Sequence, residues 1–398
     1  MDTEQHEYIK AQFAQLRSKE DLLSLLNYAK KIVYGPEAIP FELRHLTYHA
    51  NPVNNPSRYK SFVIKKKSGG ERIIHAPCTG LKSLLKCLNC ILTAVFDPHP
   101  AAKGFVTGLS IVDNAAKHTG KRFVYNMDLK DFFPGIERGR IVKRLQTPPF
   151  NLNSKLAVII AGLCCHTMEV ERFTDNVWQT VTRNVLPQGA PTSPIMTNII
   201  CQRLDKRLAG AARKYGAVYT RYADDITFSS GRNIFSKGSH LITEVTRIIA
   251  DQNFTVNAKK TRLQSFGYRQ EVTGLVINEK VNVKRRYILE IRLLLHLWEK
   301  LGFAATEAVF HERYRKDKGH VKKGTASMIA VLGGKLDFLK MVRGSDDLIY
   351  QRLNSKYMQL KEDHQAQTDP MNTVAGLILE GKTEEAMEFY SKFKNNKQ

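Results

Sequence analysis

Residues 222–225 read Tyr-Ala-Asp-Asp, which places two adjacent carboxylates, Asp224 and Asp225, between two short runs of β-branched and aromatic residues. The runs at 218–221 and 226–228 predict a strand–turn–strand hairpin with the acidic pair at its turn. Because adjacent carboxylates repel each other, a fold that holds them together usually holds a divalent cation as well. An acidic pair in a turn is more often a solvated surface, so the interpretation depends on the upstream sequence.

A third carboxylate, Asp128, lies at the end of a strand predicted over residues 122–128, and Pro134 ends the segment that follows. An aspartate at a strand end and an aspartate pair on a neighbouring hairpin can converge on two Mg²⁺ ions, which prefer oxygen ligands and leave positions open for phosphate. Two such ions activate an attacking oxygen and stabilise a leaving one, as phosphoryl transfer requires. We therefore predict Asp128, Asp224 and Asp225 as catalytic residues and as ligands of two Mg²⁺ ions.

The order of the motifs is similar to that of a known family. Asp128 is followed by Phe132 and Phe133, then by Leu-Pro-Gln-Gly at 186–189, and then by Tyr-Ala-Asp-Asp. This series resembles the palm of a reverse transcriptase. The resemblance implies an α+β fold, a right-hand polymerase with fingers, palm and a helical thumb.

Two shorter elements narrow the resemblance. Asn-Ala-x-x-His at 114–118 and Val-Thr-Gly at 272–274 are similar to elements of bacterial retron reverse transcriptases. Each element alone is short, but both occur at the expected places around the same palm. The resemblance spans roughly residues 55–345.

The reaction implied by the resemblance is RNA-templated DNA synthesis, in which a primer hydroxyl attacks the α-phosphate of a dNTP and pyrophosphate leaves. The nucleotide-binding residues that it implies are Lys67, Arg72, Leu129, Asp131, Phe132, Phe133, Gln188 and Lys259. Lys67 and Arg72 would clamp the triphosphate, Gln188 would line the nucleotide pocket, and Lys259 or its neighbour Lys260 would approach the pyrophosphate. The Phe133 ring would lie against the sugar and leave no room for a 2′-hydroxyl, whereas Phe132 is more readily a core residue.

The RNA- and primer-binding residues that the resemblance implies are Asn114, His118, Val272, Thr273, Gly274, Lys284, Arg285 and Arg286. Asn114 and His118 lie four residues apart and share one face of a predicted helix. Two roles stay open for this pair, a contact with RNA or a hydrogen bond to one another in the core.

The sequence predicts five segments along the chain. They are an N-terminal helical segment over 1–50, fingers over 51–121, a palm over 122–278 with part of the fingers within about 137–185, a thumb over 279–345 and a C-terminal helical extension over 346–398. The secondary structure predicted within them includes a hairpin at 59–76, helices at 81–96, 110–118, 195–214 and 238–252, and strands at 261–266 and 271–277. Two short helices are predicted at 372–380 and 383–394.

Charge favours a polyanionic partner. The 398 residues hold 61 Lys+Arg against 38 Asp+Glu, a net charge of +23 that exceeds what solubility requires. Residues 279–323 hold twelve Lys+Arg against six Asp+Glu, whereas 361–398 hold five against seven. The N-terminus has no apolar secretion segment, and the longest apolar run is too short for a membrane, so we expect a cytoplasmic protein.

The function that the resemblance implies is copying of a dedicated structured non-coding RNA, which serves as template and primer source, into a branched RNA–DNA molecule primed from a guanosine 2′-hydroxyl. Such systems commonly act in anti-phage defence with an effector protein, and the acidic C-terminal extension is the expected docking surface. Deletion of residues 362–398 is then expected to spare synthesis. The alternatives are a group II intron-like, other defence or diversity-generating reverse transcriptase and, from another class, an inactive RNA-binding scaffold.

Overall fold

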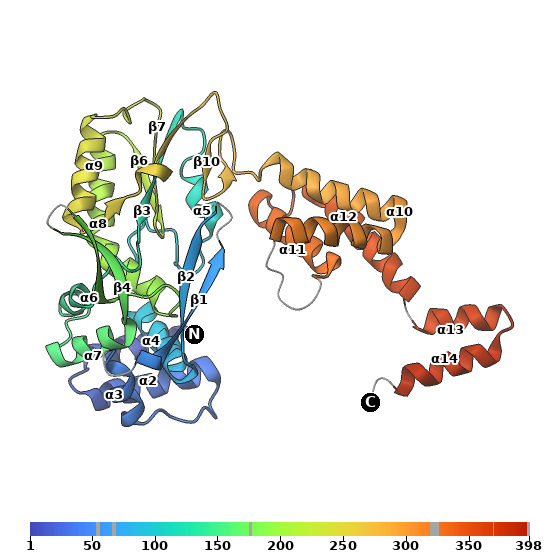
Figure 1. Ribbon diagram of the computed structural model, residues 1–398, viewed down its shortest axis with the longest axis horizontal. Helices are drawn as coiled ribbons and strands as arrows, with labels where there is room; N and C mark the ends of the chain where they lie inside the picture. The colour runs from blue at the N-terminus through green and yellow to red at the C-terminus, as the bar shows by residue number, and fades with distance from the viewer. Residues whose placement is uncertain (53–55, 66–68, 175–176, 319–325, 369, 396–398) are drawn as a thin grey trace. The chain divides into compact units, whose positions relative to one another are not determined.

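The structure is a computed structural model that describes residues 1–52, 56–65, 69–174, 177–318, 326–368 and 370–395. The chain divides into two compact units, one of Met1–Thr273 with Ile277–Glu279 and one of Gly274–Val276 with Lys280–Gln398. Figure 1 shows strands and helices together in the first unit and mainly helices in the second. All three candidate catalytic aspartates lie in the first unit.

An antiparallel five-stranded sheet forms the centre of the first unit. Its strands are β3 (Phe123–Lys130), β6 (Val218–Tyr222), β7 (Asp225–Ser230), β8 (Thr255–Val256) and β9 (Arg262–Ser265). The central strand is β3, which pairs with β7 on one side and with β9 and β8 on the other. Alternate residues of these strands face the core, where Met127, Ile226 and Phe228 are buried.

Two helices cover part of this sheet. α8 (Ser193–Lys214) packs on β6 and on α9 (His240–Asp251), as Figure 1 shows, and α9 also packs on β8. Pro194 lies in the first turn of α8, where its fixed φ suits the helix and its missing N–H has no partner to lose. Both helices were predicted from the sequence, and they hold the sheet against a buried apolar layer.

The N-terminal part of this unit is helical. α1 (Thr3–Ala14), α2 (Lys19–Tyr34), α3 (Leu43–Ala50), α4 (Thr79–Val95) and α7 (Ser154–Cys164) pack on one another. α4 buries the apolar residues that recur at helical spacing, namely Leu81, Leu84, Leu85, Leu88, Ile91 and Leu92. α2 begins with a capping box, in which the Asp21 N–H donates to Ser18 Oγ (3.1 Å) and the Ser18 N–H donates to Asp21 Oδ2 (2.9 Å).

Two hairpins extend from the first unit. β1 (Tyr59–Lys65) and β2 (Glu71–Pro77) form the antiparallel hairpin that the sequence predicts. β4 (His166–Thr174) and β5 (Val177–Val185) form a second hairpin, for which no strands were predicted. The remaining short helices are α5 (Ile111–Ala116) and α6 (Arg138–Leu145).

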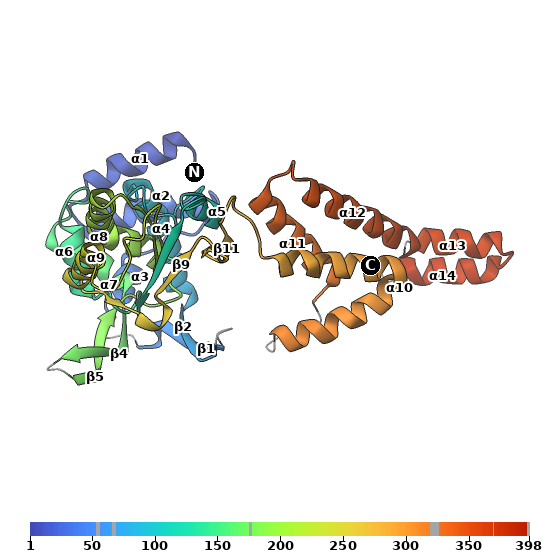
Figure 2. The same ribbon diagram turned by 90° about the horizontal axis from the view of Figure 1, so that it is seen from above.

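The second unit contains a three-helix bundle of α10 (Arg285–Lys318), α11 (Met328–Arg343) and α12 (Leu348–Thr368), which lie side by side in Figure 2. Gly302, with φ of 77°, interrupts the helical conformation of α10. The C-terminal extension predicted over 346–398 includes α12, but α12 packs on α10 and α11. Leu353 and Tyr357 are buried there, and the Tyr357 hydroxyl donates to the carbonyl of Ile329 (3.1 Å).

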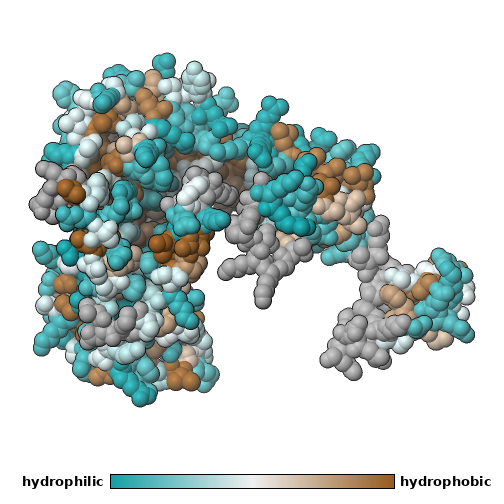
Figure 3. Space-filling view, in the orientation of Figure 1, coloured by the Kyte–Doolittle hydropathy of each residue, from teal (hydrophilic) through white to brown (hydrophobic). Residues whose placement is uncertain are grey.

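A helical hairpin follows the bundle. α13 (Pro370–Leu379) and α14 (Thr383–Asn395) match the two short helices that the sequence predicts. Gly381 has φ of 78° in the turn, and the Lys382 N–H donates to the carbonyl of Leu377 (2.8 Å), so the turn ends α13 as a glycine C-cap does. Apolar and hydrophilic side chains lie next to each other on this hairpin in Figure 3, and Leu379 and Met387 are 88% and 69% exposed.

Four of the six cysteines are buried in the core. All six are free thiols, and Cys87, Cys164, Cys165 and Cys201 are buried. Burial raises the pKa of Cys87 to about 12, which suits an inert thiol and not a metal ligand. Of the helices within the described ranges, none has the combination of length and apolar character that a membrane crossing requires.

Candidate active site

Strand register brings the three aspartates to one end of the sheet. Asp128 on β3 lies directly opposite Asp225 on β7, and the β6–β7 hairpin pairs Tyr222 with Asp225, so that Ala223 and Asp224 form its two-residue turn. The Leu129 N–H donates to the carbonyl of Asp224 (3.1 Å), which ties the turn to β3. Neighbouring strands thus present three carboxylates at the same edge, as the sequence pattern predicts.

The turn that carries Asp224 packs closely against Gly104. Ala223 adopts the left-handed region with φ of 58° and is buried, a combination that a residue with Cβ adopts only under constraint. Gly104 lies against it so closely that a Cβ at Gly104 would meet the Ala223 nitrogen at 2.7 Å. Sequence reasoning missed Gly104, since one glycine far upstream gives no signal of this contact.

A buried ion pair supports the same turn. Arg221 is fully buried and makes two bonds to the buried Asp205 carboxylate, Nε to Oδ1 at 2.8 Å and Nη2 to Oδ2 at 2.7 Å. Its remaining donors reach the Asn198 side-chain oxygen (3.0 Å) and the carbonyl of Ala223 (3.1 Å). The Arg221 guanidinium therefore connects α8 to the backbone of the Ala223–Asp224 turn, the candidate catalytic turn.

The buried Asp128 carboxylate is already neutralised by the protein. The Lys260 ammonium donates to Asp128 Oδ2 (2.7 Å), and the Asn257 side-chain amide donates to Asp128 Oδ1 (2.9 Å). Both residues belong to the turn around the short 3-10 helix η2 (Ala258–Lys260). Of the two adjacent lysines, Lys259 was predicted to bind the nucleotide, but it is the ammonium of Lys260 that contacts the Asp128 carboxylate.

Burial and mutual repulsion make Asp224 and Asp225 less acidic. The pKa of Asp224 is raised by burial and by Asp128, and the pKa of Asp225 is raised to about 6 by burial and by Asp224 and Asp128. Asp225 keeps part of its surface accessible, but the neighbouring carboxylates still disfavour its charged form. A cluster of this kind stores electrostatic energy that a bound cation would release.

The donor set fits divalent metal ions. Three carboxylates provide the hard oxygen ligands that Mg²⁺ prefers, and the Lys260 ammonium shows that Asp128 accepts a cation. In the described part of the chain no three His, Cys, Asp or Glu side chains already surround a common point as metal ligands would. The fit therefore rests on the chemistry of the carboxylates and on the strand register that gathers them.

Asp225→Asn is expected to raise the stability of the metal-free protein at pH 7 by about 1 kcal/mol or less, because part of the side chain faces solvent. The pKa of this carboxyl rises from 3.8 to about 6 on folding, so between these pH values the folded state binds more protons than the unfolded state. The contribution of Asp225 to stability therefore falls as the pH rises across this range. Thermal unfolding with a chelator should show the gain at pH 7 and none near pH 4. A loss of stability at pH 7 would contradict this electrostatic account.

The Leu-Pro-Gln-Gly loop contacts the β1–β2 hairpin. The His75 N–H of β2 donates to the carbonyl of Gln188 (2.9 Å), and Gly189 has φ of 124° with no room for a Cβ beside the carbonyl of His75 (2.7 Å). The close approach that this glycine permits is therefore to the backbone of β2. Gln188 itself is half-buried.

Arg72 is the cation that this hairpin contributes to the site. It is exposed on β2 and close enough to Asp224 to favour the charged form of that carboxylate and so to oppose the rise of its pKa. Lys67, predicted as its partner in binding the triphosphate, lies outside the described residues.

The residues that follow Asp128 divide between core and surface. The side chains of Leu129 and Phe132 are buried in the core, Phe132 against Phe254 with ring centroids 5.5 Å apart, so they do not line a nucleotide site as predicted. Phe133 is half-buried and Asp131 is exposed in the left-handed region with φ of 46°. Phe133 is thus the ring in this segment that a nucleotide could meet.

A second ring, missed by sequence reasoning, lies beside Phe133. Phe105 is 40% exposed, and its ring centroid lies 6.2 Å from that of Phe133. Its φ of 61° is rare for a bulky residue, and its carbonyl accepts a bond from the Asn198 side chain (3.3 Å). Gly104 and Phe105 therefore connect the catalytic turn with the ring that would contact the sugar.

The chain is similar in sequence to known proteins. A family model described as reverse transcriptase (RNA-dependent DNA polymerase) matches residues 64–292. The chain is 38% identical over 256 residues to the retron Mx65 reverse transcriptase of Myxococcus xanthus, a match that covers 64% of this chain and 59% of that protein. It is 32% identical over 259 residues to the retron Ec86 reverse transcriptase of Escherichia coli, which covers 64% of this chain and 72% of that protein.

This chain belongs to the retron reverse transcriptases. A third relative, the retron Mx162 reverse transcriptase of Myxococcus xanthus, is 32% identical over 296 residues, which cover 70% of this chain and 60% of that protein. The matches span about three fifths of the length of the two Myxococcus relatives. The expected α+β polymerase fold is confirmed by the family match and by the mixture of helices and sheets.

In this retron reverse transcriptase, Asn114 and His118 have neither of the two roles that the sequence left open. His118 is fully buried, and its ring nitrogens lie 2.7 Å from the hydroxyl oxygens of Ser229 and Thr220 on β7 and β6. The Asn114 amide lies 3.5 Å from Thr273 Oγ1. The Asn-Ala-x-x-His element thus fixes α5 to the catalytic sheet, and the buried His118 side chain is not available to RNA.

The Val-Thr-Gly element forms a tight turn. Thr273 and Gly274 have φ of 47° and 85° between the two-residue strands β10 (Glu271–Val272) and β11 (Leu275–Val276), as a type I′ hairpin requires. The strand predicted over 271–277 is therefore interrupted at its centre. Val272 is buried, and the Thr273 hydroxyl donates to the carbonyl of Ile111 (3.3 Å), so the exposed Gly274 is the part open to a ligand.

The three predicted basic residues lie at the start of α10. Lys284, Arg285 and Arg286 are all exposed, and the Arg286 Nε donates to Glu290 Oε1 (3.1 Å). All three belong to the second unit, whereas the three aspartates belong to the first.

Proposed function

We propose that this protein is an RNA-directed DNA polymerase that copies a dedicated structured RNA by two-metal phosphoryl transfer. The observation that carries the proposal is the register of β3 with β7, which sets Asp128 opposite Asp225 beside the Asp224 turn in a chain of the reverse transcriptase family. An inactive scaffold has no use for carboxylates whose crowding raises their pKa. Incorporation of labelled dNTP on a primed RNA template tests the proposal.

Asp128, Asp224 and Asp225 would hold the two Mg²⁺ ions. When bound, these ions would help to deprotonate the primer hydroxyl and offset the charge that builds up on the phosphate. Arg72 would bind the triphosphate, and Gln188 would line the pocket for the nucleotide. Lys260, which already lies on Asp128, is placed better than Lys259 to neutralise negative charge at this edge.

Phe133→Ala is expected to let the enzyme incorporate ribonucleotides, because removal of the ring opens space for a 2′-hydroxyl beside the sugar. We expect discrimination between dNTP and rNTP to fall about tenfold or more, the range that one added group in a shaped pocket controls. Competition between dGTP and GTP on the same primed template measures this ratio. Phe133→Tyr keeps the ring and serves as the matched control; unchanged discrimination in Phe133→Ala would remove this role.

The RNA partner would be a structured non-coding RNA that supplies both template and priming guanosine, giving a branched RNA–DNA product. The sequence similarity to named retron reverse transcriptases supports this reading over a group II intron-like or diversity-generating enzyme. A net charge of +23 supports binding to such a polyanion. The system would act in anti-phage defence together with an effector protein.

Deletion of residues 370–398 is expected to leave synthesis within about twofold of the full chain while abolishing effector binding. The C-terminal hairpin offers an apolar and acidic surface, with Ile378, Leu379 and Met387 exposed. The cut belongs after α12 and not at residue 362, because His364 stacks on Phe303 with ring centroids 3.9 Å apart. Primer extension and co-purification of the neighbouring gene products measure the two effects, and lost synthesis would assign the hairpin to the polymerase.

A further inference from the structure

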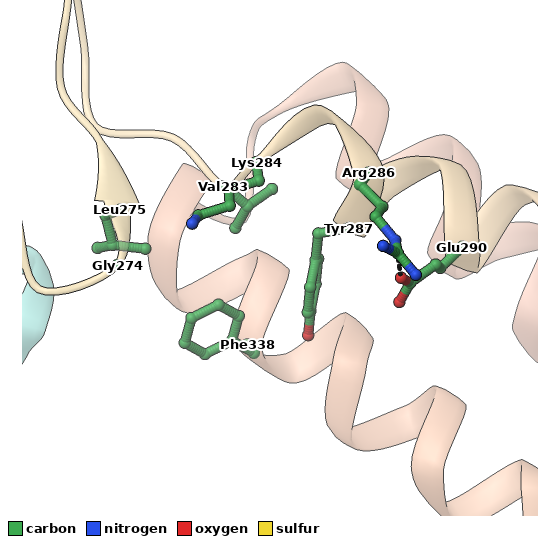
Figure 4. Close-up of a pocket in the computed structure, with 8 residues that line it drawn as sticks. All are labelled: Gly274, Leu275, Val283, Lys284, Arg286, Tyr287, Glu290 and Phe338. Atoms are coloured by element: carbon green, nitrogen blue, oxygen red, sulfur yellow. Dashed lines mark hydrogen bonds and ion pairs between the residues drawn. The ribbon is translucent and has the colours of Figure 1, made fainter. Parts of the chain in front are cut away.

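A small pocket lies in the second unit at the beginning of α10, and the candidate catalytic residues take no part in it. It encloses about 220 Å³ and is lined by Gly274, Leu275, Val283, Lys284, Arg286, Tyr287, Glu290 and Phe338. In Figure 4 the Tyr287 ring stands between an apolar flank, which includes Leu275 and Phe338, and a charged flank where Arg286 pairs with Glu290. Pockets for drug-sized ligands usually measure about 300 Å³ or more, so this smaller pocket suits a single planar ring.

Contacts with α11 fix the Tyr287 ring in place. Its hydroxyl donates to the carbonyl of Lys335 (3.1 Å), its centroid lies 5.4 Å from that of Phe338, and the Lys335 ammonium lies 4.9 Å from the ring centre. An aromatic ring that is already ordered loses little entropy when another ring stacks on it. Tyr287 is thus a preformed stacking surface at the edge of a basic segment.

The charged flank suits a sugar and a phosphate. Glu290 receives bonds from the Arg286 Nε (3.1 Å) and the Lys335 ammonium (2.8 Å), and these bonds orient Arg286. The Arg286 side chain is 82% exposed, and its two terminal nitrogens are available in the geometry that matches phosphate. A carboxylate held by two cations keeps lone pairs that a 2′-hydroxyl can donate to.

We propose that this pocket binds one unpaired nucleotide of an RNA strand. The base stacks on Tyr287 against the apolar flank, the phosphate contacts Arg286 and Lys284, and the 2′-hydroxyl donates to Glu290. Stacking on an aromatic side chain accepts any base, whereas the hydroxyl contact favours RNA over DNA. The inference rests on the proposed function in so far as RNA is the strand that the enzyme copies.

Photo-crosslinking tests the assignment on the full chain. The probe is a short single-stranded RNA of mixed sequence in which uridine and guanosine are replaced by 4-thiouridine and 6-thioguanosine, and mass spectrometry locates the crosslinked peptides. We expect crosslinks at Tyr287 or Phe338, reduced about tenfold in Tyr287→Leu and retained in Tyr287→Phe, which keeps the ring but loses the hydroxyl bond. Arg286→Ala should also reduce the yield, whereas Arg292→Ala, which removes the same charge from the exposed surface of α10, should not.

Three results would overturn the proposal. The first is the absence of crosslinks from the pocket peptides. The second is an equal loss of crosslink yield in Tyr287→Leu and Tyr287→Phe, which would indicate a structural role of the hydroxyl. The third is an equal crosslink yield with the deoxy form of the probe. Primer extension by the wild type is measured in parallel. Primer extension without pocket crosslinks would refute only the proposed role of the pocket in binding RNA. Pocket crosslinks without any extension on primed RNA would refute the proposed polymerase function.

Discussion

Arg221→Met is expected to destabilise the first unit by about 3–5 kcal/mol and to lower polymerase activity in whatever folded protein remains. The substitution leaves the Asp205 carboxylate buried without its cation. Removal of one partner from a buried ion pair typically lowers the free energy of unfolding by this amount. It also removes the donor that holds the carbonyl of Ala223 in the catalytic turn. Chemical denaturation and primer extension measure the two effects.

A matched control separates burial from charge. Arg207 pairs with Asp251 at 2.6 Å, but both side chains are partly exposed, so Arg207→Met should cost about 0–1 kcal/mol. The double variant Arg221→Met with Asp205→Leu should recover much of the stability, because no charge stays buried. Its activity should stay low, since the turn still lacks its donor; full activity there would show that Arg221 serves stability alone.

Asp224→Asn is expected to lower the rate of dNTP incorporation by at least about a thousandfold, or about 4 kcal/mol of transition-state stabilisation. Asparagine keeps the size of the side chain and removes the charge that would hold Mg²⁺ at the turn. Saturating Mg²⁺ should stabilise the wild type by about 2–3 kcal/mol at a hundred times its dissociation constant, and this gain should shrink in the variant.

The metal titration has a matched control in Asp251→Asn, which removes an exposed carboxylate from the end of α9. That variant should keep both the wild-type rate and the full stabilisation by Mg²⁺. If Asp224→Asn were stabilised by Mg²⁺ as strongly as the wild type, the metal site would have to lie elsewhere.

The sheet and its carboxylates could be predicted from the sequence because their signals are local. β-branched and aromatic residues mark β3, β6 and β7, and the two-residue turn fixes the register of β6 with β7. The pairing of Asp128 with Asp225 across β3 and β7 joins residues far apart in the sequence and is given by the structure. The helices α8, α9, α13 and α14 follow from apolar spacing in the same way.

The residues that hold the site in place have no local sequence pattern by which they could be predicted. Arg221 and Asp205 are sixteen residues apart on different elements, and a buried pair looks in the sequence like two ordinary surface charges. Lys259 and Lys260 are equivalent in a turn until η2 places one of them on Asp128. Val272-Thr273-Gly274 resembles the middle of a strand, because a β-branched residue with positive φ is rare.

The central claim is best tested by incorporation of labelled dNTP on a primed RNA template with Mg²⁺, using the wild type and Asp224→Asn side by side. We expect extension by the wild type that depends on Mg²⁺ and on the RNA template, and none above background by the variant. If the wild type extends nothing even when co-expressed with its cognate RNA, or if Asp224→Asn extends at the wild-type rate, the assignment of this site as a polymerase centre is contradicted.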